Sequence, residues 1–306
     1  MFLLKSMGNC SILNEEVFYF GGQTMSKIRL MTHNLWKKDK NSPEWETKGY
    51  DCSAEARSRG FVKLYGELKA DLIGCQEASP LMAELLMCGC LENGQKYALL
   101  WGKDTPILYS VEKFELIDSE FLLYPETIPE YEGCFNNKNT KSASIAVFRI
   151  KESGKLFIFA TTHLWWKRSD PAAKNYQPYS DEARAYQLNL LIKAVKHYEA
   201  KYSCPSVIVG DFNDGYDSKC LQEAFEKGYS HAHDVATDYA DESVGMHYCF
   251  GDGFETEYYD LPFEKAIDHI LVGGTGDVTV RRFQRYSPDY YFPLSDHSPA
   301  FMDAEL

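Results

Sequence analysis

The sequence feature that most constrains the fold is a short apolar segment followed at once by spaced polar residues. Residues 206–209 are rich in valine and isoleucine and follow a proline, which predicts a buried strand. Gly210 then frees the backbone, and Asp211 and Asn213 stand at the exit of the strand. Because side chains two positions apart lie on the same side of an extended chain, Asp211 and Asn213 are expected to point to one place, with Phe212 packed behind them. A carboxylate beside a carboxamide suits a hard metal ion or a phosphate, although the same pattern also ends ordinary strands as a turn.

The same pattern recurs in other segments of the chain. Predicted strands at residues 28–36, 71–77, 156–164 and 266–272 each carry a polar residue able to bind a metal ion or a phosphate, and another polar group precedes the last predicted strand. If these strands are neighbours in a sheet sandwich, their ends share one rim and the polar residues meet in one pocket. The candidate residues are Asn34, Glu77, His163, Asp211, Asn213, Asp268, Asp296 and His297.

Taken singly, most of these residues also have an ordinary explanation. Asn34 fits a turn, Glu77 a surface charge and His163 a core histidine. Asp268 is harder to explain in this way, because it lies in an apolar run and an isolated buried carboxylate is costly unless it is paired. His297 is its candidate partner, since an aspartate holds an imidazole in one tautomer and raises its basicity.

The balance of predicted elements indicates the fold class. Predicted strands outnumber predicted helices, which favours sheets packed on each other with helices outside. The acidic, aromatic segment 234–264 is expected to form a loop or lid. No repeat, low-complexity tract or linker divides the chain. One domain is therefore predicted over residues 25–306, preceded by an extension at residues 1–24.

Composition narrows the range of partners. The net charge of −13 disfavours constitutive, sequence-independent binding to long nucleic acid, which usually needs a basic face. No apolar run approaches the roughly 20 residues that span a bilayer, and the first residues lack the apolar stretch of a signal peptide. The nine cysteines are scattered and lack zinc spacing, so we expect reduced thiols and a cytoplasmic protein. No segment indicates an obligate protein partner.

Taken in order, the motifs resemble those of the endonuclease/exonuclease/phosphatase superfamily, which has the deoxyribonuclease I-like fold. The matching pieces are Thr32-His33-Asn34-Leu35-Trp36, Asp71-Leu72-Ile73-Gly74-Cys75-Gln76-Glu77, Thr161-Thr162-His163-Leu164, Gly210-Asp211-Phe212-Asn213, Ile267-Asp268-His269-Ile270 and Ser295-Asp296-His297-Ser298-Pro299. No single motif is specific, but the ordered set covers residues 28–306. The resemblance implies a four-layer α/β/β/α sandwich built from two mainly antiparallel sheets. It also implies hydrolysis of a phosphoester with the help of a metal ion, usually Mg²⁺ and sometimes Mn²⁺.

The resemblance further implies which residues hold the metal ion. Glu77 would ligate it, Asp296 would support the site, and Asn34 would touch the metal or the phosphate. These oxygen ligands also favour Mg²⁺ over Zn²⁺ on chemical grounds, since the chain has no cysteine or histidine cluster with zinc spacing.

The remaining residues of the set would carry out the chemistry that the resemblance implies. Asp211 would orient or deprotonate the attacking water, and Asn213 would hold that water or a phosphate oxygen. His297, polarised by Asp268, would bind the phosphoryl oxygen or act in proton transfer. His163 would hydrogen-bond the phosphate or protonate the leaving group.

The sequence leaves the substrate class open. Trp165, Trp166 and Arg168 would stack a base or sugar and hold a phosphate, unless a tryptophan packs in the core instead. His247 lies where relatives often place a wall of the substrate site. We expect a nuclease or phosphodiesterase acting on a small or single-stranded substrate. The alternatives are a phosphatase for a small phosphorylated metabolite, sugar or lipid headgroup, and a non-catalytic binding module, which the complete set of expected residues disfavours.

Overall fold

A computed structural model describes residues 26–242, 245–248, 258–274, 278–291 and 293–306. The predicted extension at residues 1–24 lies outside the described residues. Within the described ranges, no helix is both long and apolar enough to cross a bilayer. The seven cysteines of these ranges are free thiols, and Cys75 is buried in the core.

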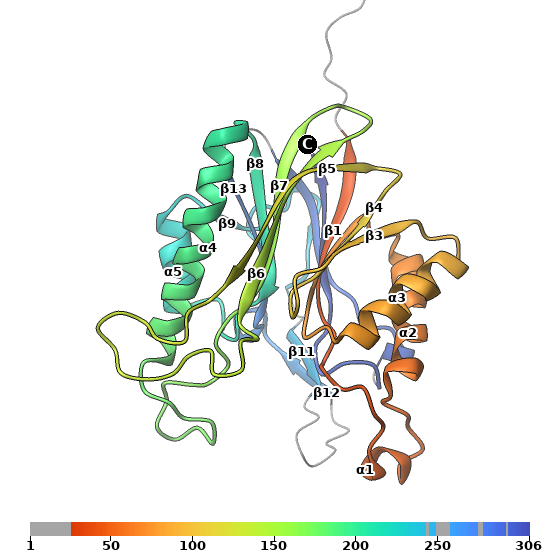
Figure 1. Ribbon diagram of the computed structural model, residues 1–306, viewed down its shortest axis with the longest axis vertical. Helices are drawn as coiled ribbons and strands as arrows, with labels where there is room; N and C mark the ends of the chain where they lie inside the picture. The colour runs from red at the N-terminus through yellow and green to blue at the C-terminus, as the bar shows by residue number, and fades with distance from the viewer. Residues whose placement is uncertain (1–25, 243–244, 249–257, 275–277, 292) are drawn as a thin grey trace, which may run out of the picture.

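Two mixed sheets form the centre of the molecule (Figure 1). The larger sheet has the strand order β10 (Tyr239–Ala240), β14 (Thr279–Arg285), β15 (Ala300–Glu305), β1 (Lys27–Asn34), β2 (Leu72–Gln76), β4 (Ile107–Ser110) and β3 (Tyr97–Leu100). The other sheet has the order β5 (Phe114–Leu123), β6 (Ser142–Ile150), β7 (Leu156–His163), β8 (Pro205–Asp211), β13 (Asp268–Gly274) and β9 (Ser230–His231). Most neighbouring strands are antiparallel, whereas β1–β2, β7–β8 and β10–β14 are parallel.

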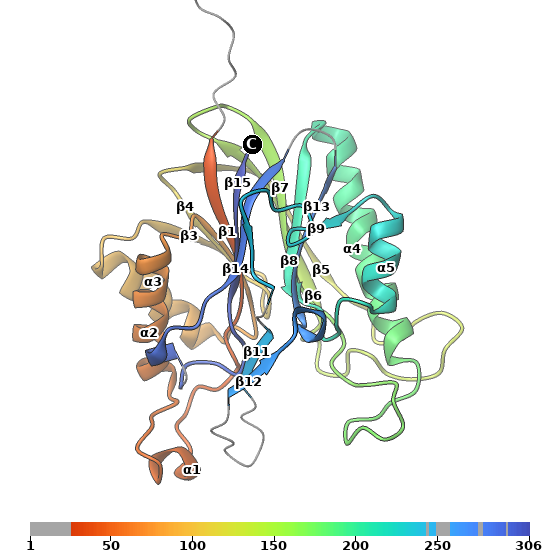
Figure 2. The ribbon, with the colours of Figure 1, turned by 180° about the vertical axis from the view of Figure 1, so that it is seen from behind.

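Helices cover the outer face of each sheet. In Figures 1 and 2, α2 and α3 lie against the larger sheet, and α4 and α5 lie against the other. The helices are α1 (Pro43–Glu46), α2 (Ala54–Leu68), α3 (Pro80–Glu92), α4 (Ser180–Tyr202) and α5 (Lys219–Glu226), with 3-10 turns η1 (Phe263–Lys265) and η2 (Asp289–Tyr291). Ser53 caps α2 by accepting a hydrogen bond from the Ala56 N–H group, as its position before the helix predicts. The predicted four-layer sandwich is confirmed.

Alternation of side chains along the central strands builds the cores between these layers. Leu30 of β1 and Val209 of β8 face the opposite sheet, whereas Met31 and Ile208 pack against the outer helices. All four are fully buried. Burying such a side chain contributes about 1.5–3 kcal/mol, so the inner core holds the two sheets face to face.

The same alternation brings polar side chains to one end of the inner core. The inward-facing positions lead to Asn34 at the end of β1, His163 at the end of β7 and Asp211 at the end of β8. Asp268 is the first residue of β13. His163 and Asp268 both pair with Asp211 in the strand register, one from each neighbouring strand. Three of the predicted residues are therefore side by side on one sheet.

The prediction of a loop or lid over residues 234–264 is partly wrong. This segment contains β10, η1 and a two-stranded ribbon formed by β11 (Gly245–Tyr248) and β12 (Tyr258–Leu261). Its many tyrosines favour strands, which the acidic composition obscured. Both views place the ribbon at the end of the molecule opposite the C-terminus. Residues 249–257 lie outside the described residues.

Gly74 of β2 marks a close approach of the two sheets. A Cβ atom at this position would lie 2.5 Å from Val209 Cγ2 and 2.7 Å from Thr161 Cβ, both in the opposite sheet. Next to it, Gln76 donates a hydrogen bond to Thr161 Oγ1 at 2.8 Å. A glycine and a hydrogen bond between the sheets thus separate the apolar core from the polar end.

Gly74→Ala is expected to lower the free energy of unfolding by about 1–3 kcal/mol, because the added methyl group overpacks the space between the sheets. Urea unfolding measures this difference. Gly66→Ala in α2 is the matched control, since its methyl group would meet only the flexible Gln95 side chain, and alanine favours a helix by up to about 1 kcal/mol over glycine. Equal stability of the two variants would contradict the close approach.

Candidate active site

Asp211 stands at the centre of the polar end. Its side chain is buried, and its Oδ1 accepts a hydrogen bond from the Asn213 backbone N–H group at 2.8 Å. Its Oδ2 accepts another from Asn34 Nδ2 at 3.0 Å, which joins the two sheets. Burial raises the pKa of Asp211, and the charge of Asp268 adds to the shift, although nearby cations oppose it. The result is a carboxylate that is more basic than usual and suited to accept a proton from water.

Two aspartate–histidine pairs flank Asp211. His297 Nδ1 lies 2.8 Å from Asp268 Oδ2, and His163 Nδ1 lies 2.7 Å from Asp104 Oδ2. The Nε2 atoms of the two rings lie 3.9 Å and 3.5 Å from Asp211 Oδ2. The structure therefore brings together the predicted Asp268–His297 pair and adds a second pair on the other side of Asp211.

His297 is held as a cation. Burial lowers its pKa, but the charges of Asp268 and Asp211 outweigh this effect, so the pKa stands well above its ordinary value of 6.5. Its backbone is fixed as well, because its N–H group donates to Ser295 Oγ at 3.1 Å and its carbonyl accepts from Tyr291 Oη at 2.7 Å. A fixed imidazolium is a strong hydrogen-bond donor for an oxyanion.

Two residues on the His163 side were missed by the sequence reasoning. Asp104 lies in the turn between β3 and β4, where glycine and aspartate are ordinary turn residues and gave no signal. Lys141 directly precedes β6, and its side chain is only 5% exposed, with Nζ against His163 Nε2. Burial lowers the pKa of Lys141, and the charges of Glu77 and Asp211 offset part of this shift. No signal in the sequence marked Lys141, because Lys138 lies in the same polar segment and a lysine is mostly exposed.

Asp296 and Glu77 have carboxylate oxygens left for a cation. Asp296 Oδ1 is buried and has no hydrogen-bond partner within the described residues. Burial raises the pKa of Asp296 to about 7, and the charges of Glu77 and Asp211 add to this shift, although His297 opposes it. A divalent cation would supply the missing partner and the opposite charge.

Geometry also limits which side chains ligate such a cation. Glu77, His163 and Asp211 each bring one ligand atom within 4.8 Å of the others. However, the two ring nitrogens of His163 already face Asp104 and Lys141. Carboxylate oxygens therefore remain as the ligands, and this donor set fits a hard divalent cation.

Asn34 is hydrogen-bonded to Asp211 and to the backbone of Trp36. Its Oδ1 accepts a hydrogen bond from the Trp36 backbone at 2.9 Å, and its Nδ2 donates to Asp211. The side chain is 1% exposed and does not line the pocket. Asn34 therefore positions Asp211, and the prediction that it also touches the metal or the phosphate stays a prediction.

Strained backbone occurs at two of the predicted positions. Glu77 has φ of 57° and Asn213 has φ of 56°, in the left-handed region. Such residues cost about 1–3 kcal/mol each and concentrate at functional sites. The Asn213 side chain is held by a hydrogen bond from its Nδ2 to the Leu164 carbonyl at 3.0 Å. Its backbone N–H group thereby stays directed at Asp211.

Arg57 of α2 fixes the loops that carry the site. Its side chain is 1% exposed, and it donates to five carbonyl oxygens, those of Leu35, Trp36, Lys38, Cys52 and Leu294. The segments after Asn34 and before Asp296 are thus tied to one guanidinium. Sequence reasoning gave no sign of this role, because a helical arginine is usually exposed.

The polar side chains line one pocket of about 450 Å³. Trp166 and Arg168 also line it, and Trp166 is 46% exposed. Trp165 is only 2% exposed and packs edge-on against Phe135, so the prediction that it contacts substrate is wrong. Trp165 packs in a small cluster with Phe135, Ile128 and Ala183. His247 belongs to β11, and its side chain lies outside the described part.

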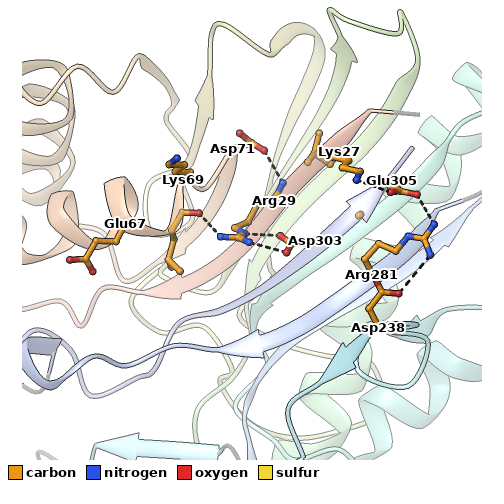
Figure 3. A pocket seen from close by; sticks show the side chains of 12 residues that line it. Lys27, Arg29, Glu67, Lys69, Asp71, Asp238, Arg281, Asp303 and Glu305 are labelled. Carbon is orange, nitrogen blue, oxygen red and sulfur yellow. Dashed lines mark hydrogen bonds and ion pairs between the residues drawn. The ribbon is translucent and has the colours of Figure 1, made fainter. Parts of the chain in front are cut away.

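A second hollow of about 810 Å³ lies at the other end of the sheets (Figure 3). Several of the described charged residues that line it pair with one another, whereas Glu67 and Lys69 do not. Arg29 Nε lies 2.6 Å from Asp303 Oδ1, and Arg281 lies 2.8 Å from Glu305 and 3.7 Å from Asp238. These paired charges leave a charged ligand few partners, so the pocket at Asp211 is the candidate active site.

Solved structures with a similar fold identify the fold of this chain. The chain matches an endonuclease/exonuclease/phosphatase family protein from Bacteroides thetaiotaomicron with a TM-score of 0.69 and 17% identity, over 93% of this chain and 97% of that one. The chain has the fold of the endonuclease/exonuclease/phosphatase family. The match confirms the resemblance that the ordered motifs indicated, at the level of the fold.

Two further solved structures are similar to this chain. A mannosyl-6-phosphatase from Bacteroides thetaiotaomicron matches with a TM-score of 0.66 and 19% identity, over 90% of this chain and 99% of that one. TDP2 from D. rerio, complexed with a single-strand DNA product, matches with a TM-score of 0.60 and 16% identity, over 91% and 99%. No family model and no curated protein sequence matched the chain.

Asp268→Asn is expected to lower the pKa of His297 in the metal-free protein, because Asp268 is the main group that raises it. Since the raised pKa belongs to the folded state, the stability from this pair is present below pH 6.5 and is lost as the pH rises through the raised value. An NMR titration of the imidazole measures the shift. Asp303→Asn, at the other end of the sheets, is the control. An unchanged pKa in Asp268→Asn would contradict the pairing.

Proposed function

We propose that this protein is a metal-dependent phosphoester hydrolase that uses Mg²⁺, with Mn²⁺ as a substitute. The observation that carries the proposal is the buried, basic Asp211 carboxylate, which lies between a protonated His297 and the buried Lys141–His163 contact. A base for water, cationic donors for phosphate oxygens and carboxylates for a metal ion are the groups that phosphoester hydrolysis requires. The shared fold supports this reading.

Glu77 and Asp296 would hold the metal ion. When bound, such an ion polarises the P–O bonds and offsets the negative charge that develops during hydrolysis. The unpartnered Asp296 oxygen and its raised pKa support this assignment, because both disfavour a carboxylate without a cation beside it.

The residues of the chain would divide the chemistry among them. Asp211 would accept the proton of the attacking water, and Asn34 would hold the Asp211 carboxylate in place. His297 would donate a hydrogen bond to a phosphoryl oxygen, with Asp268 keeping it charged. The pocket wall at Asn213 would contact the water or a phosphate oxygen.

For the substrate, we favour a phosphodiester in a small or single-stranded molecule. Trp166 exposes a ring at the pocket, and Arg168 and Lys37 add cations beside it. A base stacks on such a ring with about 1–3 kcal/mol. The net charge of −13 disfavours tight binding to a duplex, which relies on many cations. The similar D. rerio TDP2 structure was solved with a single-strand DNA product.

A phosphatase acting on a small phosphorylated molecule is the second candidate. The pocket of about 450 Å³ is large enough for one sugar phosphate. The similar Bacteroides thetaiotaomicron protein is a mannosyl-6-phosphatase. Turnover of a monoester against a diester therefore separates the two candidates.

Asp211→Asn is expected to reduce hydrolysis by about 10²- to 10⁴-fold, because it removes the proton acceptor while keeping the shape of the side chain. The substrates are bis-p-nitrophenyl phosphate, p-nitrophenyl phosphate, mannose 6-phosphate, and single- and double-stranded oligonucleotides. EDTA should abolish wild-type turnover, and Mg²⁺ or Mn²⁺ should restore it.

Asp238→Asn, in the second hollow, is the matched control and should retain wild-type turnover. Faster cleavage of the diester and the single strand would support the phosphodiesterase, whereas turnover of monoesters alone would identify the phosphatase. Wild-type turnover that survives EDTA, or equal turnover by Asp211→Asn, would contradict the proposed site.

A further inference from the structure

Hydrogen bonds from neighbouring residues fix the backbone of Lys141. Asn136, which is fully buried, accepts a hydrogen bond from the Lys141 N–H group at 2.9 Å and donates one to its carbonyl at 2.9 Å. The Tyr124 N–H group donates to the same carbonyl at 3.1 Å. These bonds fix the backbone at the start of β6 and direct a long, buried side chain into the pocket at Asp211.

The protons of His163 follow from its two partners. Burial raises the pKa of Asp104, but its hydrogen bond to His163 and the charges of His163 and Lys141 outweigh this, so the pKa lies below its ordinary value. Asp104 is therefore an acceptor, and His163 Nδ1 carries a proton toward it. The other ring nitrogen, Nε2, faces Lys141 Nζ, so both nitrogens of the ring have partners.

A group other than His163 must therefore donate a proton on this side of the pocket. Both ring nitrogens of His163 are engaged, Nδ1 by Asp104 and Nε2 by Lys141, so the ring has no nitrogen left to face a leaving group. The Lys141 ammonium has three N–H groups, and only one is used on His163. Lys37 Nζ lies 3.2 Å from Asp104 Oδ1, the carboxylate oxygen that does not face His163.

Building on the proposed hydrolase function, on which this assignment rests, we propose that Lys141 donates the proton to the leaving-group oxygen. His163 and Asp104 are then positioning residues, which hold the ammonium in place through the His163 Nε2 lone pair. This assignment moves the donor role from the histidine that the sequence suggested to a residue that carried no motif.

The proposed step is balanced in atoms and charge. The water oxygen forms a new bond to phosphorus and loses one proton to Asp211. The bond from phosphorus to the leaving oxygen breaks, its electron pair goes to that oxygen, and the oxygen takes a proton from Lys141 Nζ. The net reaction is ester and water to alcohol and phosphate. Exchange with solvent then removes the proton from Asp211 and returns one to Lys141.

The decisive test is the dependence of rate on the leaving group. Phenyl and p-nitrophenyl esters of phosphate, as monoesters or diesters according to what the wild type cleaves, differ in how much the leaving oxygen needs a proton. Lys141→Met should lose about 10²- to 10⁴-fold in kcat/KM on the phenyl ester and much less on the p-nitrophenyl ester. Lys141→Arg keeps the positive charge but is a far weaker acid, so it should show the same selective loss.

Controls separate this role from folding and from substrate binding. Lys138→Met, an exposed lysine of the same loop, should match the wild type. His163→Gln should show a smaller selective loss on the phenyl ester than Lys141→Met. An equal loss on both esters in the Lys141 variants would overturn the proposal, as would a selective loss found only in His163→Gln. Absence of turnover in the wild type would overturn the proposed function together with it.

A measurement without turnover tests the proton arrangement. In the metal-free protein, ¹⁵N NMR of the imidazoles should show His163 with Nδ1 protonated and Nε2 unprotonated. A proton on Nε2 would overturn the proposal even if the enzyme is an active hydrolase. The same spectrum of Lys141→Met verifies that the variant is folded.

Discussion

The burial of the Asp211 carboxylate at the meeting point of two sheets is the constraint on which the rest of the site depends. A buried carboxylate needs donors and opposite charge. The donors come from Asn34 in one sheet and from the Asn213 backbone beside the other, and the opposite charge comes from His297, His163 and Lys141. Because these groups belong to different layers, the site exists only while the inner core holds the sheets in register.

The two flanks of Asp211 have the same outline but different charge. On one flank, Asp268 and Asp211 keep the His297 imidazole protonated, so the ring itself is the cation. On the other flank, His163 lies between Asp104 and the buried Nζ of Lys141, which we propose as the proton donor. A fixed imidazolium suits a phosphoryl oxygen, whereas an ammonium on a longer chain suits a leaving group. The asymmetry gives the site two distinguishable ends.

Local periodicity explains what was predictable from the sequence. A strand fixes the face of every second residue, so the apolar positions of β7 and β8 also fix where His163 and Asp211 point. Asp104 and Lys141 come from a turn and a strand entrance, where no period sets direction, and Arg57 acts through distant carbonyls. Of the two adjacent tryptophans, Trp165 packs inward, against Phe135 of a segment distant in the sequence. These contacts depend on tertiary structure and leave no pattern in neighbouring residues.

The carboxylates around Asp211 could hold a metal ion, and diffraction from crystals soaked in Mn²⁺ tests the proposed metal site most directly. The anomalous signal at the manganese edge locates the ion without any assumption about substrate. We expect a peak bound by the carboxylates of Glu77 and Asp296, in the pocket that His297 and Lys141 also line. A pocket without such a peak at millimolar Mn²⁺, or a peak only in the hollow around Arg29 and Asp303, would contradict a metal-dependent hydrolase.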